Sequence, residues 1–272
     1  MPESFLVQNK MKFGISTWFF QKQPVIAALQ RIKKVGFEAA EIWMEHVLKT
    51  GEDLNEIKAA AEQLDMDISL HGTSYDTNLT SINKGIRKES YKQSEEAIVM
   101  GRRINAKVVV LHPGRLSSSK GDKKEYWEML LNSFVFIDRV AGREGVEVAI
   151  EAVEKRPREI YVMPEDLEYM LNREWQNIKL TFDIAHSYTV MEPVEYLKRL
   201  RKNWTCHVHL SDGSPETTHL PLGNGNIDID STLKVLNTFY NDLVIIEGYI
   251  PGNGKEVVKK NFNYLKKHGW VD

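Results

Sequence analysis

Six residues with metal-ligating or acid–base side chains recur along the chain, each at the end of a short apolar run. Successive members lie between 26 and 41 residues apart. They are His71, His112, Glu151, Asp183, His209 and Glu247. Burying a carboxylate or an imidazole beside an apolar run is costly unless a charge, a hydrogen bond or a metal pairs with it. The recurrence therefore indicates one shared site for metal or acid–base chemistry.

The apolar runs have the composition of buried strands, and segments with helical spacing separate them. Strands are predicted over 12–20, 39–44, 67–70, 106–111, 147–150, 178–187, 205–210 and 243–246. Helices are predicted over 25–35, 54–64, 89–104, 126–141, 163–171, 193–200, 230–240 and 256–268. We expect residues 1–10 to form a loose lead-in or a short capping strand, and 45–55 and 72–87 to form loops.

Eight strands that alternate with eight helices predict an α/β fold, a (β/α)8 TIM barrel in which residues 1–272 form a single domain. Strict alternation implies parallel strands with right-handed crossovers. The length of 272 residues is near the roughly 250 that such a barrel needs. A doubly wound open sheet is the alternative, but it would gather its site at one switch point. Here polar residues follow six strands, which favours the closed barrel.

In a parallel barrel the carboxyl ends of all strands meet on one face, so the six residues are predicted to converge there. Taken singly, each has a simpler explanation, because a strand-end histidine is usually a satisfied hydrogen-bonding residue and an acid suits a helix N-terminus. Six such coincidences are much less expected. Clustered carboxylates raise one another's pKa unless a cation is present. Mixed His, Asp and Glu ligands suit Zn²⁺, Mn²⁺, Co²⁺ or Mg²⁺.

The bulk composition points to a globular protein without an obvious polyanionic partner. Apolar residues make up 42% of the chain, the formal net charge is −2, and Cys206 is the single cysteine. No apolar run reaches the roughly 20 residues that span a bilayer, and the N-terminus lacks a signal-peptide core. We therefore expect a soluble, cytoplasmic protein with no membrane partner. Whether it is a monomer or a homo-oligomer stays open at this point.

Several other residues are weaker candidates. His207 should face the barrel interior one layer below His209, where core filling is favoured. Trp18 ends the first strand, where an aromatic lip for substrate competes evenly with core packing. Asp212 and His219 are loop residues that bind substrate or metal, or simply face solvent. The Gly-rich stretch at 222–226 matches no P-loop and no GxGxxG motif, so turn chemistry is favoured and no nucleotide cofactor is expected.

The chain resembles the superfamily of xylose isomerase-like barrels, which includes sugar isomerases and epimerases and the type IV apurinic endonucleases. The resemblance runs nearly end to end. Its most specific parts are HGTSYDTNL at 71–79, VVVLHPG at 108–114, AIEAV at 149–153, FDIAHS at 182–187, HVHLSD at 207–212, LPLGNGNID at 220–228 and IIEGY at 245–249. The superfamily implies the fold directly, but it hosts different chemistries at the same rim.

Similarity to the epimerase branch implies that Glu151, Asp183, His209 and Glu247 hold one divalent metal. The two glutamates would also act as acid and base on opposite faces of a ketose, and His186 would contact substrate. A metal of this kind acts as a Lewis acid that stabilises an enediolate. One glutamate would remove the proton alpha to the carbonyl and the other would return it.

Similarity to the endonuclease branch implies three zinc ions instead. His71, His112 and Glu151 match the first site, and the epimerase set matches the second. For the third site, His186 and His219 match, but Thr217 stands where the family has an aspartate. The segment 45–55 carries three acids and one lysine, a poor surface for a DNA duplex.

The sequence thus leaves three hypotheses. The favoured one is a divalent-metal sugar or sugar-phosphate isomerase or epimerase with a small-molecule sugar as partner. The alternative is a zinc-dependent abasic-site endonuclease, for which nucleic acid would be the partner. The third is a metal-stabilised binding barrel without catalysis. His71 and His112 bind metal or substrate, depending on the hypothesis.

Overall fold

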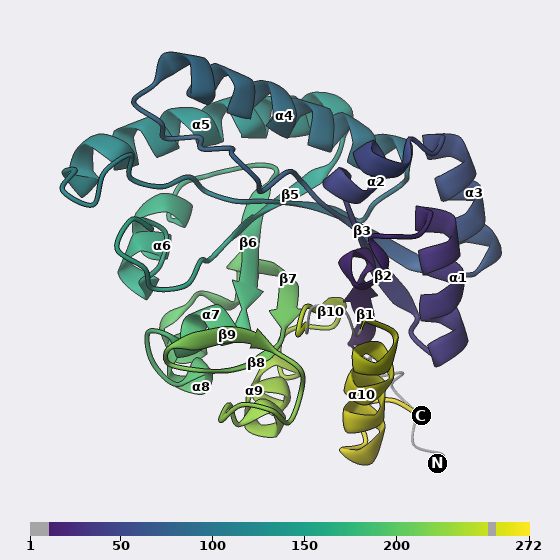
Figure 1. Cartoon of the computed structure of the whole chain (residues 1–272). Helices are drawn as coiled ribbons and strands as arrows, with labels where there is room; N and C mark the ends of the chain where they lie inside the picture. Colours follow the sequence, from purple (N-terminus) through teal and green to yellow (C-terminus); the bar gives the residue numbers. More distant parts are fainter. Residues whose placement is uncertain (1–10, 250–253) are drawn as a thin grey trace, which may run out of the picture.

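A computed structural model describes residues 11–249 and 254–272 as a closed barrel of eight parallel strands (Figure 1). The order around the barrel is β1-β10-β7-β6-β5-β4-β3-β2, so the first strand pairs with the last. The barrel strands are β1 Lys12–Ser16, β2 Ala39–Trp43, β3 Asp67–His71, β4 Val108–Leu111, β5 Glu147–Glu151, β6 Ile178–Asp183, β7 Thr205–Leu210 and β10 Leu243–Ile246. This confirms the predicted (β/α)8 TIM barrel.

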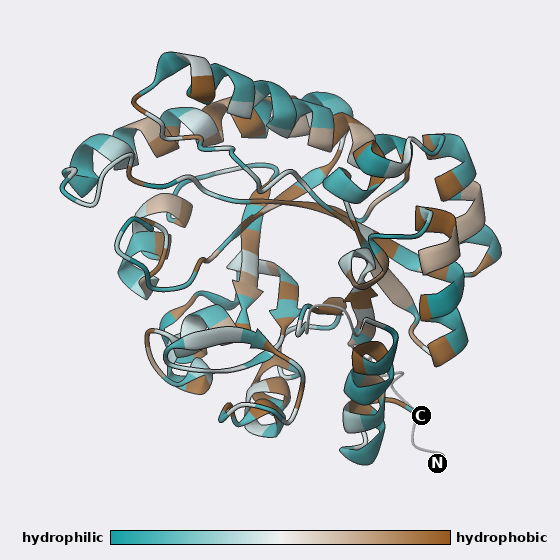
Figure 2. Cartoon of the chain, viewed as in Figure 1, coloured by the Kyte–Doolittle hydropathy of each residue, from teal (hydrophilic) through white to brown (hydrophobic). Residues whose placement is uncertain are grey.

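Helices connect the strands and form the outer layer. They are α1 Val25–Val35, α2 Met44–Thr50, α3 Leu54–Gln63, α4 Lys84–Arg103, α5 Lys123–Glu144, α6 Pro164–Leu171, α7 Ile184–Tyr188, α8 Pro193–Arg199, α9 Ile229–Leu236 and α10 Gly254–Lys267. Side chains cap several N-termini; Asp53, for example, accepts hydrogen bonds from two backbone N–H groups of α3. The outward sides of the helices are largely hydrophilic and the strands largely hydrophobic (Figure 2). Among the described residues, no helix combines the length and apolar character needed to cross a membrane.

The main core lies between the strands and the helices. It contains Leu29 and Ile32 of α1, Leu130 and Phe134 of α5, and many strand residues such as Ile150, all fully buried. A second, small apolar cluster of Ala39, Leu243 and Ile245 is separate from it.

Polar residues at alternate strand positions are buried as well. They are Glu41, Ser69, His71, Glu151, Thr181, Asp183, His207 and His209. Because side chains alternate across a strand, this set shares the inner face of the sheet. The inner face thus holds buried polar side chains, while the outer face packs against the helices.

Short elements at the carboxyl ends of strands differ from the sequence-based expectation. Residues Thr17–Phe20 form a 3₁₀ helix (η1) instead of extending β1. The expected loop 45–55 is largely α2, β6 stops at Asp183, and α7 follows it at once. A two-stranded hairpin of β8 Asp212–Ser214 and β9 Thr217–Leu220 was not predicted. The expectation for residues 1–10 lies outside the described residues.

The long helices α4 and α5 extend beyond their predicted bounds. Helix α4 begins at Lys84 because Asn83 caps it, accepting hydrogen bonds from the backbone N–H groups of Gly85 and Ile86. Helix α5 begins at Lys123 after the cap Asp122 and ends before Gly145, which adopts a left-handed conformation. The polar composition of the two first turns therefore led to predicted starts that are too late, whereas the capping residues let both helices begin earlier.

Candidate metal centre

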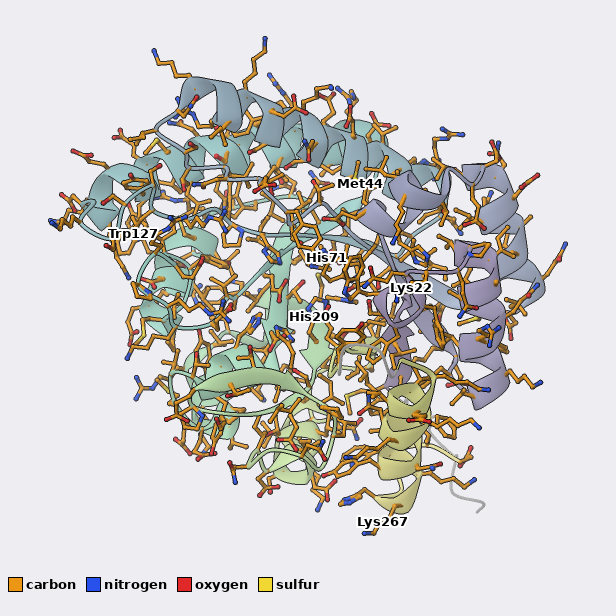
Figure 3. The ribbon with its side chains drawn as sticks, viewed as in Figure 1. Lys22, Met44, His71, Trp127, His209 and Lys267 are labelled. Carbon is orange, nitrogen blue, oxygen red and sulfur yellow. The ribbon has the colours of Figure 1, made fainter. Side chains whose placement is uncertain are left out.

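The six predicted residues do converge at the carboxyl end of the barrel. His71, Glu151 and Asp183 are the last residues of β3, β5 and β6, and His209 lies in β7. His112 and Glu247 directly follow β4 and β10. His71 and His209 lie near the middle of the molecule, where the strand ends meet (Figure 3).

Glu151, Asp183, His209 and Glu247 form a group of four possible ligands, with one ligand atom from each lying within 4.8 Å of the others. Nδ1 of His209 lies 3.3 Å from Oε1 of Glu151, 3.4 Å from Oε2 of Glu247 and 4.0 Å from Oδ2 of Asp183. Three carboxylates and one imidazole therefore face a common point. Such a set of O and N donors is suited to a divalent cation.

Two observations test whether a cation fits this group. Oδ2 of Asp183 and Oε1 of Glu247 are buried and have no hydrogen-bond partner within the described part of the protein. Burial raises the pKa of Glu247 to about 7, and the charges of Glu151 and Glu41 act in the same direction against the opposing charge of His209. A bound cation would pair with the orphaned oxygens and relieve the repulsion, so the residues fit a metal.

A second group of possible ligands comprises His71, His112 and Glu151. Oε2 of Glu151 lies 3.1 Å from Nε2 of His112 and 3.5 Å from Nε2 of His71. Nδ1 of His71 lies 2.7 Å from the carbonyl oxygen of Gly72, which turns Nε2 toward the cavity. Burial alone would lower the pKa of His71, but Glu151 and Glu41 outweigh it and raise it to about 9.

A third group joins Asp183, His186 and His219. Nε2 of His186 lies 3.0 Å from Nε2 of His219, and Nδ1 of His186 lies 3.0 Å from the carbonyl oxygen of Ala152. His186 belongs to α7 and His219 to the hairpin strand β9, so two unpredicted elements position this pair.

The environments of the two histidines differ. Burial lowers the pKa of His219, and the charge of His186 adds to the effect. Burial would also lower the pKa of His186, but the charges of Asp183 and Glu151 outweigh this effect and raise the pKa to about 9. Only one of the pair is therefore readily protonated at neutral pH, which allows a single N–H to be shared between them.

Glu41 is a residue of the candidate site that the sequence pattern did not predict. It is fully buried in β2, and its carboxylate lies 3.2 Å from Nε2 of His209 and 2.9 Å from Nε2 of His207. Ser69 donates a third hydrogen bond to it. Burial would raise the pKa of Glu41, but His209 and His207 hold it well below its usual range. The signal was an acid inside the apolar run AAEIW at an inward-facing position.

Glu41 leaves Nδ1 of His209 free to face the three acids. A carboxylate that fixes the far nitrogen of a metal-ligating histidine is a common arrangement in metal sites. Glu41, His207 and His209 also form a group with metal-like spacing of their own. His207 fills the interior layer below His209, as its spacing predicted.

The ligand groups open into a cavity of about 270 Å³. It is lined by Ser16, Trp18, Phe19, Trp43, His71, His112, Glu151, Glu154, His186, His219, Glu247 and Tyr249. Trp18 stacks on Trp43 with ring centroids 4.9 Å apart, and Trp43 stacks on His71 at 4.4 Å. Trp18 thus lies at the cavity, as one of its two interpretations predicted. Glu154 and Tyr249 were not predicted to line it, because nothing in the sequence marks them except their nearness to Glu151 and Glu247.

The structure does not bring Asp212 into this cavity. Its buried carboxylate accepts hydrogen bonds from the backbone N–H groups of Gly213, Gly223, Gly225 and Ile227. Asp212 therefore holds the Gly-rich segment in place, which agrees with the turn chemistry predicted for residues 222–226.

Comparisons with known proteins agree with the barrel fold. A family model described as a xylose isomerase-like TIM barrel matches residues 29–268. An uncharacterized protein of Methanocaldococcus jannaschii is 26% identical, and the alignment covers 87% of this chain and 88% of that protein. A fructoselysine 3-epimerase of Shigella flexneri is 24% identical, with 82% of this chain and 84% of the relative covered.

Two solved structures have the same fold. A D-tagatose 3-epimerase-like protein superposes with a TM-score of 0.80 at 24% identity, covering 95% of this chain and all of the other. The IOLI protein, whose structure contains a bound zinc atom, superposes with a TM-score of 0.78 at 18% identity, covering 95% and 96%. At these identities the structures establish the shared barrel.

Proposed function

We propose that this chain, which belongs to the xylose isomerase-like TIM barrel family, is a divalent-metal-dependent sugar isomerase or epimerase. The observation that carries this proposal is the group of Glu151, Asp183, His209 and Glu247, of which Glu151 and Glu247 line a cavity. The sugar epimerases among its relatives and structural neighbours support the same class of reaction.

The four side chains of this group would hold the metal, which would be Mn²⁺, Zn²⁺, Co²⁺ or Mg²⁺. When bound, it would polarise neighbouring carbonyl and hydroxyl oxygens of the substrate and stabilise an enediolate. Glu151 and Glu247 both line the cavity, from strands β5 and β10. One glutamate would remove the proton alpha to the carbonyl, and the other would deliver a proton to a carbon of the enediolate.

The remaining cavity residues suit a polyhydroxylated substrate. Trp18, Trp43 and Tyr249 offer aromatic faces to the C–H side of a sugar. His112, His186 and His219 offer ring nitrogens to hydroxyl groups. The cavity combines apolar walls with a few convergent polar groups, as expected of a small-molecule site.

The test is turnover of a panel of ketoses and aldoses by protein loaded with Mn²⁺, Co²⁺, Mg²⁺ or Zn²⁺. In deuterated water an active sugar should gain deuterium at the carbon alpha to its carbonyl, because the abstracted proton exchanges with solvent. Glu151→Gln and Glu247→Gln should each reduce kcat by at least about a hundredfold, which is typical of a lost acid–base group. Glu256→Gln, an exposed change in α10, is the matched control.

Absence of turnover and of deuterium exchange with every metal would contradict the proposal. Ligand affinity that persists in both glutamate variants, with no activity in the wild type, would instead favour a non-catalytic binding barrel.

A second candidate is a zinc-dependent phosphodiesterase that acts on abasic nucleic acid. The observation that favours it is the presence of two further ligand groups, His71–His112–Glu151 and Asp183–His186–His219, around the first. It predicts two or three zinc ions per chain by elemental analysis and nicking of an abasic duplex. One metal per chain and an intact duplex would exclude it.

A further inference from the structure

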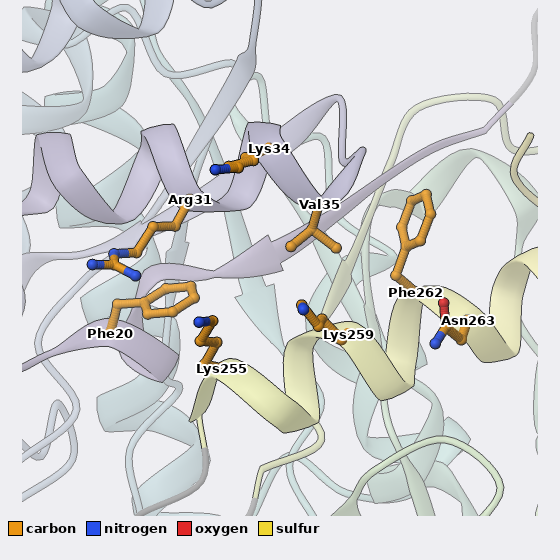
Figure 4. A pocket seen from close by; sticks show the side chains of 8 residues that line it. All are labelled: Phe20, Arg31, Lys34, Val35, Lys255, Lys259, Phe262 and Asn263. Atoms are coloured by element: carbon orange, nitrogen blue, oxygen red, sulfur yellow. The ribbon is translucent and has the colours of Figure 1, made fainter.

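A cavity of the described chain lies apart from the metal centre, in a groove between α1 and α10 (Figure 4). Its volume is about 610 Å³, within the roughly 300–1,000 Å³ usual for small-molecule sites. It is lined by Phe20, Arg31, Lys34, Val35, Lys255, Lys259, Phe262 and Asn263. We call it the cationic groove.

The charges of the cationic groove have one sign. Arg31 and Lys34 face it from α1, and Lys255 and Lys259 from α10 (Figure 4). No acidic side chain is among its lining residues, and none of these four cations has an ion pair with another described residue. The whole chain has 36 basic and 38 acidic residues. The groove therefore represents a local separation of charge in a nearly neutral protein.

Apolar side chains form the floor between the cations. Phe20 is buried and lies between Arg31 and Lys255 (Figure 4). Phe262 packs edge-on against the core residue Phe37, with ring centroids 5.2 Å apart. A solvated basic helix face needs no such hollow, whereas an anion attached to an organic group would use both the cations and the floor.

The cationic groove continues toward the metal centre. A neighbouring cavity of about 450 Å³ shares Phe20, Arg31 and Lys255 with the groove, and it adds Lys22. The same cavity shares Phe19 and Tyr249 with the metal-site cavity. Those two rings pack edge to face, with centroids 5.5 Å apart, and separate the cationic side from the metal side.

We propose that the cationic groove binds a phosphate-bearing small molecule, with its phosphate oxygens against Arg31, Lys255 and Lys259 and its organic part against Phe20. Arginine and lysine form strong charge-assisted hydrogen bonds with phosphate. The phosphate belongs either to one end of a long substrate or to a separate ligand. Only the first source rests on the proposed sugar-isomerase function.

The test is calorimetric titration of the full-length protein with inorganic phosphate, pyrophosphate and phosphorylated sugars, with neutral sugars in parallel. Titration of both metal-loaded and metal-free protein separates the groove from direct binding to the metal. We expect saturable binding of at least one phosphorylated probe in both forms, weakened by added salt because the partners are exposed charges.

The variant is the double substitution Arg31→Gln/Lys255→Gln. It should weaken that binding by about tenfold or more, since two charge-assisted contacts are lost. The matched control is Lys266→Gln/Lys267→Gln, which makes the same change in charge at exposed positions of α10 outside the groove. The control should bind the probe as the wild type does.

Kinetics then identify the source. If the Arg31→Gln/Lys255→Gln variant has a higher KM than the wild type for a phosphorylated sugar and an unchanged KM for a neutral sugar, the phosphate belongs to the substrate. If the same variant loses phosphate binding while neither KM changes, the phosphate belongs to a separate ligand. The titrations retain their meaning if no turnover is found.

Three results would overturn the proposal. They are the absence of saturable binding by every phosphorylated probe, an equal loss of binding in both double variants, and binding of single-stranded oligonucleotides alone.

Discussion

At the scale of single residues, the candidate site consists of possible metal ligands and of Glu41, which fixes the orientation of one of them. Glu41 faces Nε2 of His209 from a buried strand, while Nδ1 faces the acids. A ligand whose ring is fixed beforehand loses less freedom when a metal binds, and such supporting residues commonly contribute ten- to a hundredfold in metal affinity.

We expect Glu41→Gln to weaken metal binding by roughly tenfold or more. A competition titration of Zn²⁺ or Co²⁺ against a chelator measures the affinity without any assay of activity. Ser69→Ala is the graded control, because it removes one hydrogen bond to Glu41 and leaves the contact with His209 in place. If both variants bind metal as the wild type does, Glu41 has no role in positioning.

The six residues of the recurrent pattern share one property, which is that each lies at or next to the carboxyl end of a barrel strand. Because parallel strands end on one face, position along the chain was enough to predict that His71, Glu151 and Asp183 meet. Glu41 lies within its strand, and its partner His207 lies 166 residues away in the chain. A contact of that separation depends on the register of the closed barrel, which local patterns do not contain.

At the scale of elements, short segments after the strands position much of the site. Helix α7 places His186, and the β8–β9 hairpin places His219 beside it. These segments are five residues or fewer in length, too short for a periodic pattern to reveal. The long helices were predictable because their apolar spacing repeats over several turns, and the strands were predictable because each is a short run of apolar residues between two helical segments.

Asp212 anchors this region by accepting four backbone hydrogen bonds from 213–227. We expect Asp212→Ala to lower the free energy of unfolding by about 2–4 kcal/mol, because buried N–H groups lose their acceptor. Urea denaturation measures the change. Asp212→Asn keeps one acceptor oxygen, so it should cost less than Asp212→Ala. An equal effect of the two variants would contradict the role assigned to the carboxylate.

At the scale of the whole molecule, charged residues link strands at the amino end of the barrel, opposite the site. Asp67 of β3 lies 2.6 Å from Nζ of Lys12 in β1 and 3.1 Å from Nζ of Lys107, which precedes β4. Lys107 also lies 3.5 Å from Asp242, which precedes β10. The ion pairs thus lie at the amino-end face and the candidate site at the carboxyl-end face, which is the usual division between stability and activity in this fold.

This cluster predicts a pH-dependent contribution to stability. Burial would raise the pKa of Asp67, but the hydrogen bonds from Lys12 and Lys107 outweigh it and lower the pKa. A lowered folded-state pKa stabilises the protein above the unfolded value of about 3.9 and loses that contribution as the pH falls through the folded value.

We therefore expect Asp67→Asn to reduce stability at pH 7 by no more than about 1 kcal/mol, because water partly screens the pair. The difference from the wild type should start to shrink as the pH falls below about 4 and vanish once the pH lies below the lowered folded-state pKa of Asp67. Urea denaturation at a series of pH values measures it. A difference that stays constant down to acid pH would show that the charge of Asp67 is not its source.

The closure of the barrel by β1 and β10 has a consequence for timing. The four main candidate ligands come from four strands, and the last of them, Glu247, follows the strand that closes the ring. A nascent chain still lacking β10 on the ribosome has an open sheet and only part of the ligand set. Assembly of the complete set of candidate ligands therefore has to wait until translation has passed residue 247 and β10 has paired with β1.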